Sequence, residues 1–146
     1  MNEDLRQVYQ DIISDHFRHP RMSGWSGEGW KDVLNVNPSC GDQIRIACRL
    51  DASGRQMIEW RHQSQGCAAS VASASIMCGL LNGLSPDIAR DRISAFLGEL
   101  ENPNGEKEPD PDAFERQALL FFRKVPSRVV CVRLAWDAAH RLLESA

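Results

Sequence analysis

The chain has 146 residues, of which 42% are hydrophobic and 25% charged, and its formal net charge is −3 at pH 7. This composition is typical of a globular protein with its own core, and the small negative charge argues against binding to nucleic acid. We expect a single domain over residues 1–146, with no segment able to cross a bilayer and no targeting peptide.

The first predicted element is an amphipathic helix over residues 3–18. Apolar side chains recur there at helical spacing, and Pro20 follows as a stop signal. His16 falls on the apolar stripe and is predicted to be a satisfied core residue, whereas His19 is predicted at the surface. Residues 21–32 are rich in glycine and predict a loop whose two tryptophans anchor it to the body of the protein.

A small three-stranded antiparallel sheet is predicted next. Residues 33–37 form a short strand, and residues 43–50 a clearer one because their apolar and polar side chains alternate. Residues 51–55 predict a turn, after which residues 56–63 return as the third strand and complete a hairpin. His62 lies on the inner face of that strand and is predicted to be a satisfied core residue.

Helices are predicted for the second half of the chain. The segment that follows Cys67 is almost uncharged and rich in small residues, which is typical of a helix buried on several sides. Residues 85–100 predict another helix, with Ser85 as its N-cap and Pro86 at its first position.

A polar, Pro-rich linker at residues 101–112 precedes two further helices. Asp112 and Glu115 resemble a capping pair that opens the first of them, and the last helix follows Pro126 and places His140 at the surface. The fold class predicted from this order is α+β, a small antiparallel sheet packed against several helices.

Five cysteines, an odd number, are spread over the chain, so a disulfide scaffold is not expected and the cytoplasm is the favoured compartment. Two of them are predicted to be core residues. Cys48 lies on the apolar face of its strand, where a thiol behaves as a small hydrophobe. Cys78 lies roughly 16 Å along the same helix from Cys67, which is too far for the two to share a metal ion.

The other three cysteines lie at the ends of predicted elements. Cys40 belongs to the turn NPSCGD, Cys67 opens a helix whose N–H groups and dipole favour a thiolate, and Cys131 lies near the start of the last helix. Asp42 is an available oxygen donor if these ends converge. Spacing alone leaves three interpretations of the turn open: a simple turn, an acid/base pair, or half of a metal site.

Four segments carry a family resemblance. They are VYQDIISDHFRHPRMSG at 8–24, NPSCGDQIRI at 37–46, GCAASVASASIM at 66–77 and PSRVVCVRLAWDA at 126–138. In this order they resemble the IscU/SufU/NifU N-terminal superfamily of iron–sulfur cluster assembly proteins. The resemblance covers nearly the whole chain and implies the α+β fold of that superfamily.

The segment before the last cysteine indicates the branch. The IscU branch has a histidine immediately before that cysteine and a proline-rich chaperone-recognition segment upstream, whereas this chain has Val130 and KVPSR. The long segment between Cys67 and Cys131 resembles the SufU branch of zinc-dependent sulfurtransferases. SufU-like proteins often carry a lysine where Val130 stands, and this departure bears on partner contact or on the tuning of Cys131.

The resemblance implies a zinc site formed by Cys40, Asp42, Cys67 and Cys131, with Cys40 as the catalytic thiol. Cys40 would accept persulfide sulfur from a SufS-type cysteine desulfurase and pass it to a downstream Suf-type scaffold or another sulfur acceptor. Arg128 either orients a ligand or contacts the partner, or it is a solvated arginine at the start of a helix.

Two alternatives stay open. In the first, the same four ligands belong to a scaffold on which an iron–sulfur cluster is assembled, although the missing histidine before Cys131 argues against it. In the second, the protein is a zinc-stabilised interaction module without catalysis, because a closed four-ligand zinc shell is normally structural.

Overall fold

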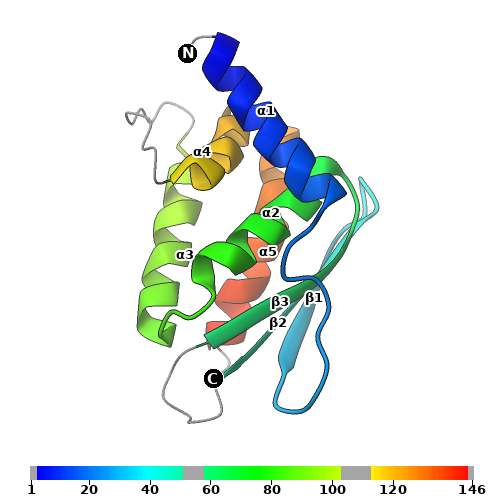
Figure 1. Cartoon of the computed structure of the whole chain (residues 1–146), viewed down its shortest axis with the longest axis vertical. Helices are drawn as coiled ribbons and strands as arrows, with labels where there is room; N and C mark the ends of the chain where they lie inside the picture. The colour runs from blue at the N-terminus through cyan, green and yellow to red at the C-terminus, as the bar shows by residue number, and fades with distance from the viewer. Residues whose placement is uncertain (1–2, 51–57, 103–112, 145–146) are drawn as a thin grey trace.

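A three-stranded antiparallel sheet with helices packed against it makes up the computed structural model, which describes residues 3–50, 58–102 and 113–144 (Figure 1). This architecture confirms the predicted α+β class. None of the helices in these ranges is long and apolar enough to cross a bilayer.

The three strands follow one another in space as they do in sequence. They are β1 (Lys31–Asn37), β2 (Asp42–Leu50) and β3 (Ile58–Gln65), and the sheet order is β1-β2-β3. All three predicted strands are therefore confirmed. The predicted turn at 51–55 and the first two positions of the predicted third strand lie outside the described residues.

The inner face of the sheet is apolar because the side chains alternate along β2. Ile44, Ile46 and Cys48 are all buried there, so the core position predicted for Cys48 is confirmed. On the outer face Arg45 forms an ion pair with Asp32 of β1. This alternation directs one face of the sheet towards the helices and the other towards solvent.

Within the described ranges, five α-helices and one short 3-10 helix complete the fold. They are α1 (Glu3–Arg18), α2 (Ala68–Leu81), α3 (Pro86–Leu100), α4 (Phe114–Leu120), η2 (Phe121–Lys124) and α5 (Pro126–Glu144). Helices α2 and α5 pack on the sheet, while α1 lies on α2 and α4, and α3 lies on α5 (Figure 1). Cys78 is fully buried in α2, as predicted.

The helix ends agree with the sequence at α3 and differ at α4. Ser85 caps α3 by accepting a hydrogen bond from the backbone N–H of Ile88 at 3.4 Å, as predicted. The capping pair predicted for α4 is wrong, because the N-cap is Ala113 and none of the described side chains forms a cap hydrogen bond there. The carboxylate of Glu115 instead lies beside Nε2 of His16, and Asp112 lies outside the described residues.

The two buried histidines connect neighbouring segments through hydrogen bonds. His16 connects α1 to α2, and His62 connects β3 to the loop that follows α1. Nδ1 of His16 lies 2.7 Å from Oγ of Ser75 on α2. Nε2 of His62 lies 2.8 Å from the backbone carbonyl of Arg21, so this nitrogen donates, and Nδ1 lies 2.7 Å from Oγ of Ser64. Both histidines are satisfied core residues, as predicted, and burial lowers the pKa of each.

The two tryptophans of the 21–32 loop contact each other, and Trp30 also contacts the sheet. Their ring centroids lie 6.2 Å apart, and the guanidinium of Arg49 on β2 lies 4.5 Å from the ring centroid of Trp30. The predicted anchoring role is therefore confirmed for Trp30. His19 is exposed and His140 is partly exposed, in agreement with their predicted surface positions.

Gly66 permits a close approach between the β3–α2 junction, where it lies, and Asp42 at the start of β2. Its φ is 153°, and a Cβ on it would lie 2.2 Å from Oδ1 of Asp42. No side chain fits in that space while the Asp42 carboxylate keeps its position. The carboxylate is fully buried, and its Oδ1 accepts a hydrogen bond from the backbone N–H of Cys67 at 2.8 Å.

We therefore expect Gly66→Ala to lower the free energy of unfolding by more than about 1 kcal/mol, because the methyl group displaces a buried, hydrogen-bonded carboxylate. The matched control is Gly79→Ala in α2, where a Cβ would meet nothing within 4 Å. This control should raise the free energy of unfolding by about 0.5–1 kcal/mol, as for other helical glycines. Urea unfolding of both variants measures the difference, and equal effects would contradict the steric argument.

The lowered pKa of His62 predicts how stability responds to acid. The ordinary pKa of histidine is 6.5, and burial lowers it in the folded state. Below that value the unfolded chain binds protons that the folded protein excludes, so the stability contributed by neutral His62 is lost as the pH falls. His62→Gln, which cannot be protonated, should lose less stability than the wild type between about pH 7.5 and pH 5.5.

The exposed His19→Gln is the control for this experiment, and it should keep the pH dependence of the wild type. Urea unfolding at the two pH values provides the comparison. An identical loss of stability in the wild type and in His62→Gln would contradict the assignment of the effect to His62.

Candidate metal centre

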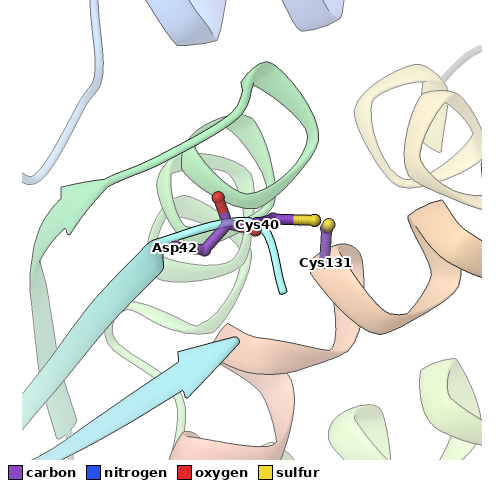
Figure 2. A group of neighbouring side chains, drawn as sticks. All are labelled: Cys40, Asp42 and Cys131. Atoms are coloured by element: carbon purple, nitrogen blue, oxygen red, sulfur yellow. The ribbon is translucent and has the colours of Figure 1, made fainter. Parts of the chain in front are cut away.

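Segments far apart in the sequence meet at one end of the sheet (Figure 2). The turn between β1 and β2 carries Cys40 and Asp42, and the start of α5 carries Cys131. One ligand atom from each of these residues lies within 4.8 Å of the other two. Figure 2 shows the sulfur atoms of Cys40 and Cys131 pointing towards each other.

The turn presents its two donors differently. Its backbone closes through the N–H of Cys40, which donates to the carbonyl of Asn37 at 3.2 Å. Gly41 follows with a φ of 71°, in the left-handed region that favours glycine. Cys40 is exposed, whereas Asp42 is fully buried as the first residue of β2. One short turn therefore provides an accessible thiol and an inaccessible carboxylate.

Cys67 lies beside this group of three but is not one of its members. It is the N-cap residue of α2 and is half-buried, and its Sγ lies 3.7 Å from Oδ2 of Asp42. The same sulfur lies 3.5 Å from Oγ of Ser70, one turn into the helix. The structure thus places the fourth predicted ligand in contact with Asp42, at the edge of the cluster.

Cys131 is the most enclosed of the three thiols. It is fully buried, and its Sγ lies 3.6 Å from the backbone carbonyl of Ser127. Burial, together with the adjacent Asp42 carboxylate and Cys67 thiol, raises the pKa of this thiol to about 12. Without a nearby cation the thiol therefore keeps its proton, and a bound cation displaces that proton.

The chemistry and the spacing of these donors fit a thiophilic divalent cation. Zinc binds thiolate sulfur at about 2.3 Å and carboxylate oxygen at about 2.0–2.2 Å, so two sulfurs of a tetrahedral site lie about 3.8 Å apart. The separations within the group of three reach no more than 4.8 Å. Coordination of one ion by this set would require side-chain movements, and Cys67, whose Sγ lies 3.7 Å from Oδ2 of Asp42, would be available as a fourth ligand.

Two predicted neighbours of the cluster lie on the surface around it. Arg128 is exposed in the first turn of α5, and Val130, which directly precedes Cys131, keeps 48% of its surface exposed. Both side chains therefore belong to the solvent-exposed surface at the start of α5.

Sequence reasoning missed Asn37 and Gly66. Asn37 is buried, and its amide nitrogen lies 3.9 Å from Sγ of Cys131, while Gly66 leaves room for the carboxylate of Asp42. Two signals were available: an asparagine directly before the proline of the turn, and a glycine directly before the cysteine that caps α2.

Comparison with known proteins identifies the family. The NifU-like N terminal domain matches residues 8–115, a range that includes Cys40, Asp42 and Cys67 and ends before Cys131. The chain is 30% identical over 140 residues to the zinc-dependent sulfurtransferase SufU of Bacillus subtilis (strain 168), covering 96% of this chain and 92% of that protein.

Two further proteins extend the comparison. The chain is 31% identical over 137 residues to the iron–sulfur cluster assembly scaffold protein IscU of Streptococcus pyogenes serotype M1, covering 92% of this chain and 81% of that protein. The crystal structure of FiSufU from Fervidobacterium islandicum AW-1 superimposes with a TM-score of 0.77 over 94% of this chain and 98% of that chain. Its 22% sequence identity shows a shared fold and no more.

The two relatives with about equal identity differ in their named activities, so the similarity establishes the family and not the branch. The family model covers more than half of the chain, and the fold agrees. The resemblance found in the sequence motifs is thereby confirmed: the chain belongs to the family of the NifU-like N-terminal domain, together with SufU and IscU proteins.

Proposed function

We propose that this protein is a zinc-dependent sulfurtransferase that accepts persulfide sulfur from a SufS-type cysteine desulfurase during iron–sulfur cluster assembly. One observation carries the proposal: an exposed thiol, that of Cys40, converges with the buried donors Asp42 and Cys131. The similarity to a zinc-dependent sulfurtransferase over nearly the whole chain supports it.

The proposed division of roles follows from the exposure of each donor. Asp42 and Cys131 are enclosed, and Cys67 is held at the start of α2, so these three residues retain the ion. Cys40 lies on a turn and is open to solvent, so it is the thiol that a partner can reach. Zinc, when bound, keeps its coordinating thiols deprotonated near neutral pH and therefore ready for transfer.

The proposed transfer is a thiolate–persulfide exchange. The thiolate of Cys40 attacks the outer sulfur of a persulfide on the desulfurase, and a new S–S bond forms to Cys40. The S–S bond of the donor breaks, and the cysteine of the desulfurase leaves as a thiolate. The persulfide hydrogen stays with the transferred sulfur. No oxidant or reductant is consumed, because one S–S bond replaces another.

The protein's own residues would allow this exchange without loss of the site. Gly41 gives the turn its left-handed bend directly after Cys40, so the thiol can turn outward while Asp42 stays in β2. The hydrogen bond between Asp42 and the N–H of Cys67 keeps two of the remaining donors together. The downstream acceptor would be a Suf-type scaffold or another sulfur acceptor, and the proposed compartment is the cytoplasm.

A second candidate is a scaffold on which an iron–sulfur cluster is built from the same donors. The similarity to the scaffold protein IscU of Streptococcus pyogenes favours it, at an identity close to that of the sulfurtransferase. In this case the cluster is the cargo of the protein, and Cys40, Cys67 and Cys131 hold it with Asp42.

Metal content separates the two candidates. A sulfurtransferase should be purified as a colourless protein with about one zinc ion per chain, as expected for a four-ligand site. A scaffold should turn brown on anaerobic reconstitution with iron and sulfide and should then transfer its cluster to an acceptor protein. Metal analysis and absorption spectra distinguish these outcomes.

Substitution of Cys40 tests the proposed chemistry. The wild-type protein should accelerate a SufS-type desulfurase that uses cysteine as its substrate, and Cys40→Ala should reduce the rate to that of the desulfurase alone. Mass spectrometry of the intact protein should detect a persulfide on the wild type and none on the variant. Both results follow from the role of Cys40 as the sulfur acceptor.

Cys48→Ala is the control, because Cys48 is a buried cysteine on the inner face of the sheet and not a donor of the cluster. It should keep both the acceleration and the persulfide. Full acceleration by Cys40→Ala would rule out the proposed transfer. A zinc-stabilised interaction module without catalysis would show that behaviour, together with unfolding when the metal is removed.

A further inference from the structure

Two asparagines on the inner face of β1 reach the same helix. Nδ2 of Asn35 donates to the backbone carbonyl of Leu134 at 3.1 Å, and Nδ2 of Asn37 donates to Sγ of Cys131 at 3.9 Å. The asparagines are two positions apart on a strand, and their partners are three positions apart on a helix, so each pair shares a face. Both side-chain amides therefore donate a hydrogen bond to α5, and only that of Asn37 donates to a thiol.

The orientation of the Asn37 amide is determined by its other end. Its Oδ1 accepts a hydrogen bond from the backbone N–H of Ser39 at 3.2 Å, so the oxygen faces the turn and the NH₂ group faces Cys131. The backbone carbonyl of Asn37 accepts the N–H of Cys40 at 3.2 Å. Asn37 as a whole is almost completely buried, with 8% of the residue's surface exposed.

We propose that Asn37 is a positioning residue that holds the sulfur of Cys131 in the metal-binding arrangement through an N–H···S hydrogen bond. The same residue fixes the turn that carries Cys40, so it joins the two thiols that come from distant parts of the chain. This inference rests on the proposed function, because it requires the cluster to bind a metal ion.

The hydrogen bond matters most when the sulfur of Cys131 binds a metal ion and carries negative charge. A hydrogen bond to a charged acceptor is about twice as strong as one between neutral groups, so the amide stabilises the sulfur in its metal-bound form. The amide also withdraws electron density from the sulfur, which makes Cys131 a poorer nucleophile. Asn37 thus increases the difference in nucleophilicity between the two sulfurs: Cys131 stays on the metal, and the accessible Cys40 is left to react.

Two substitutions separate the donor from the turn. Asn37→Ser and Asn37→Asp both keep an oxygen that can accept the N–H of Ser39, as in turns formed by these residues. The serine is too short to reach Cys131, and the aspartate places a negative charge beside the sulfur. Asn35→Ser and Asn35→Asp are the matched controls, since each removes one amide contact between β1 and α5 without touching a thiol.

Zinc affinity and the spectrum of the cobalt-substituted protein are the measurements. We expect both Asn37 variants to bind zinc about 10- to 100-fold more weakly in competition with a chelator, the range typical for loss of a partner of a metal ligand. The sulfur-to-cobalt charge-transfer band should move to lower energy, because a thiolate without its hydrogen bond gives up an electron more easily. The Asn35 variants should keep the affinity and the band of the wild type.

A second test uses only the wild-type protein, so it does not depend on whether the variants fold. After substitution with a spin-active cadmium isotope, nuclear magnetic resonance should detect scalar coupling between the metal and a side-chain amide proton of Asn37, transmitted through the N–H···S bond. Absence of this coupling in the cadmium-bound protein would overturn the inference.

The outcomes also separate this inference from the proposed function. Asn37 and Asn35 variants with the same zinc affinity and the same cobalt band would overturn the positioning role alone. A wild-type protein that binds neither zinc nor cobalt would overturn both. Weak binding and a shifted band in the Asn37 variants only would support the inference.

Discussion

The buried carboxylate of Asp42 is the constraint on which the rest of the site depends. It has no access to solvent, and a carboxylate at this depth is costly unless it is hydrogen-bonded. The backbone N–H of Cys67 provides such a bond and thereby connects the β1–β2 turn to the start of α2. The connection exists only because Gly66 leaves the space that a Cβ would fill. One hydrogen bond, together with the absence of a side chain at Gly66, thus holds the β1–β2 turn against the start of α2. The third segment of the site is the start of α5.

Crowding of acidic groups gives the cluster its chemical character. The Cys131 thiol shares a small volume with Asp42 and Cys67, and burial together with these neighbours raises its pKa to about 12. A cation that replaces the proton would satisfy such a set of donors, and its binding would then also stabilise this end of the molecule. Unequal exposure then distinguishes the donors, since Cys40 meets solvent and Cys131 does not.

Much of the fold follows from local patterns in the sequence. Alternation in residues 43–50 predicted β2 and the core position of Cys48, and the Ser85–Pro86 pair predicted the start of α3. The pattern failed at Glu115, where a local capping role competed with a tertiary one. Its carboxylate lies beside His16 of α1, and Ala113 takes the N-cap position. When a side chain could either cap a helix or pair with a distant residue, the partner that lies near it in the folded protein determines which role it takes.

For the site, the sequence by itself determined that Cys48 and Cys78 lie inside elements, because hydrophobic periodicity shows the face on which a residue lies. It also placed the other three cysteines at the ends of the predicted elements. Its motifs also identified the family, which the comparisons confirm. Only the tertiary structure decided that Cys40, Asp42 and Cys131 meet, that Cys67 lies at the edge of their group, and that Asn37 reaches the sulfur of Cys131. These contacts join positions as far as 94 residues apart, and they depend on strand register and on the packing of α5, which no local pattern encodes.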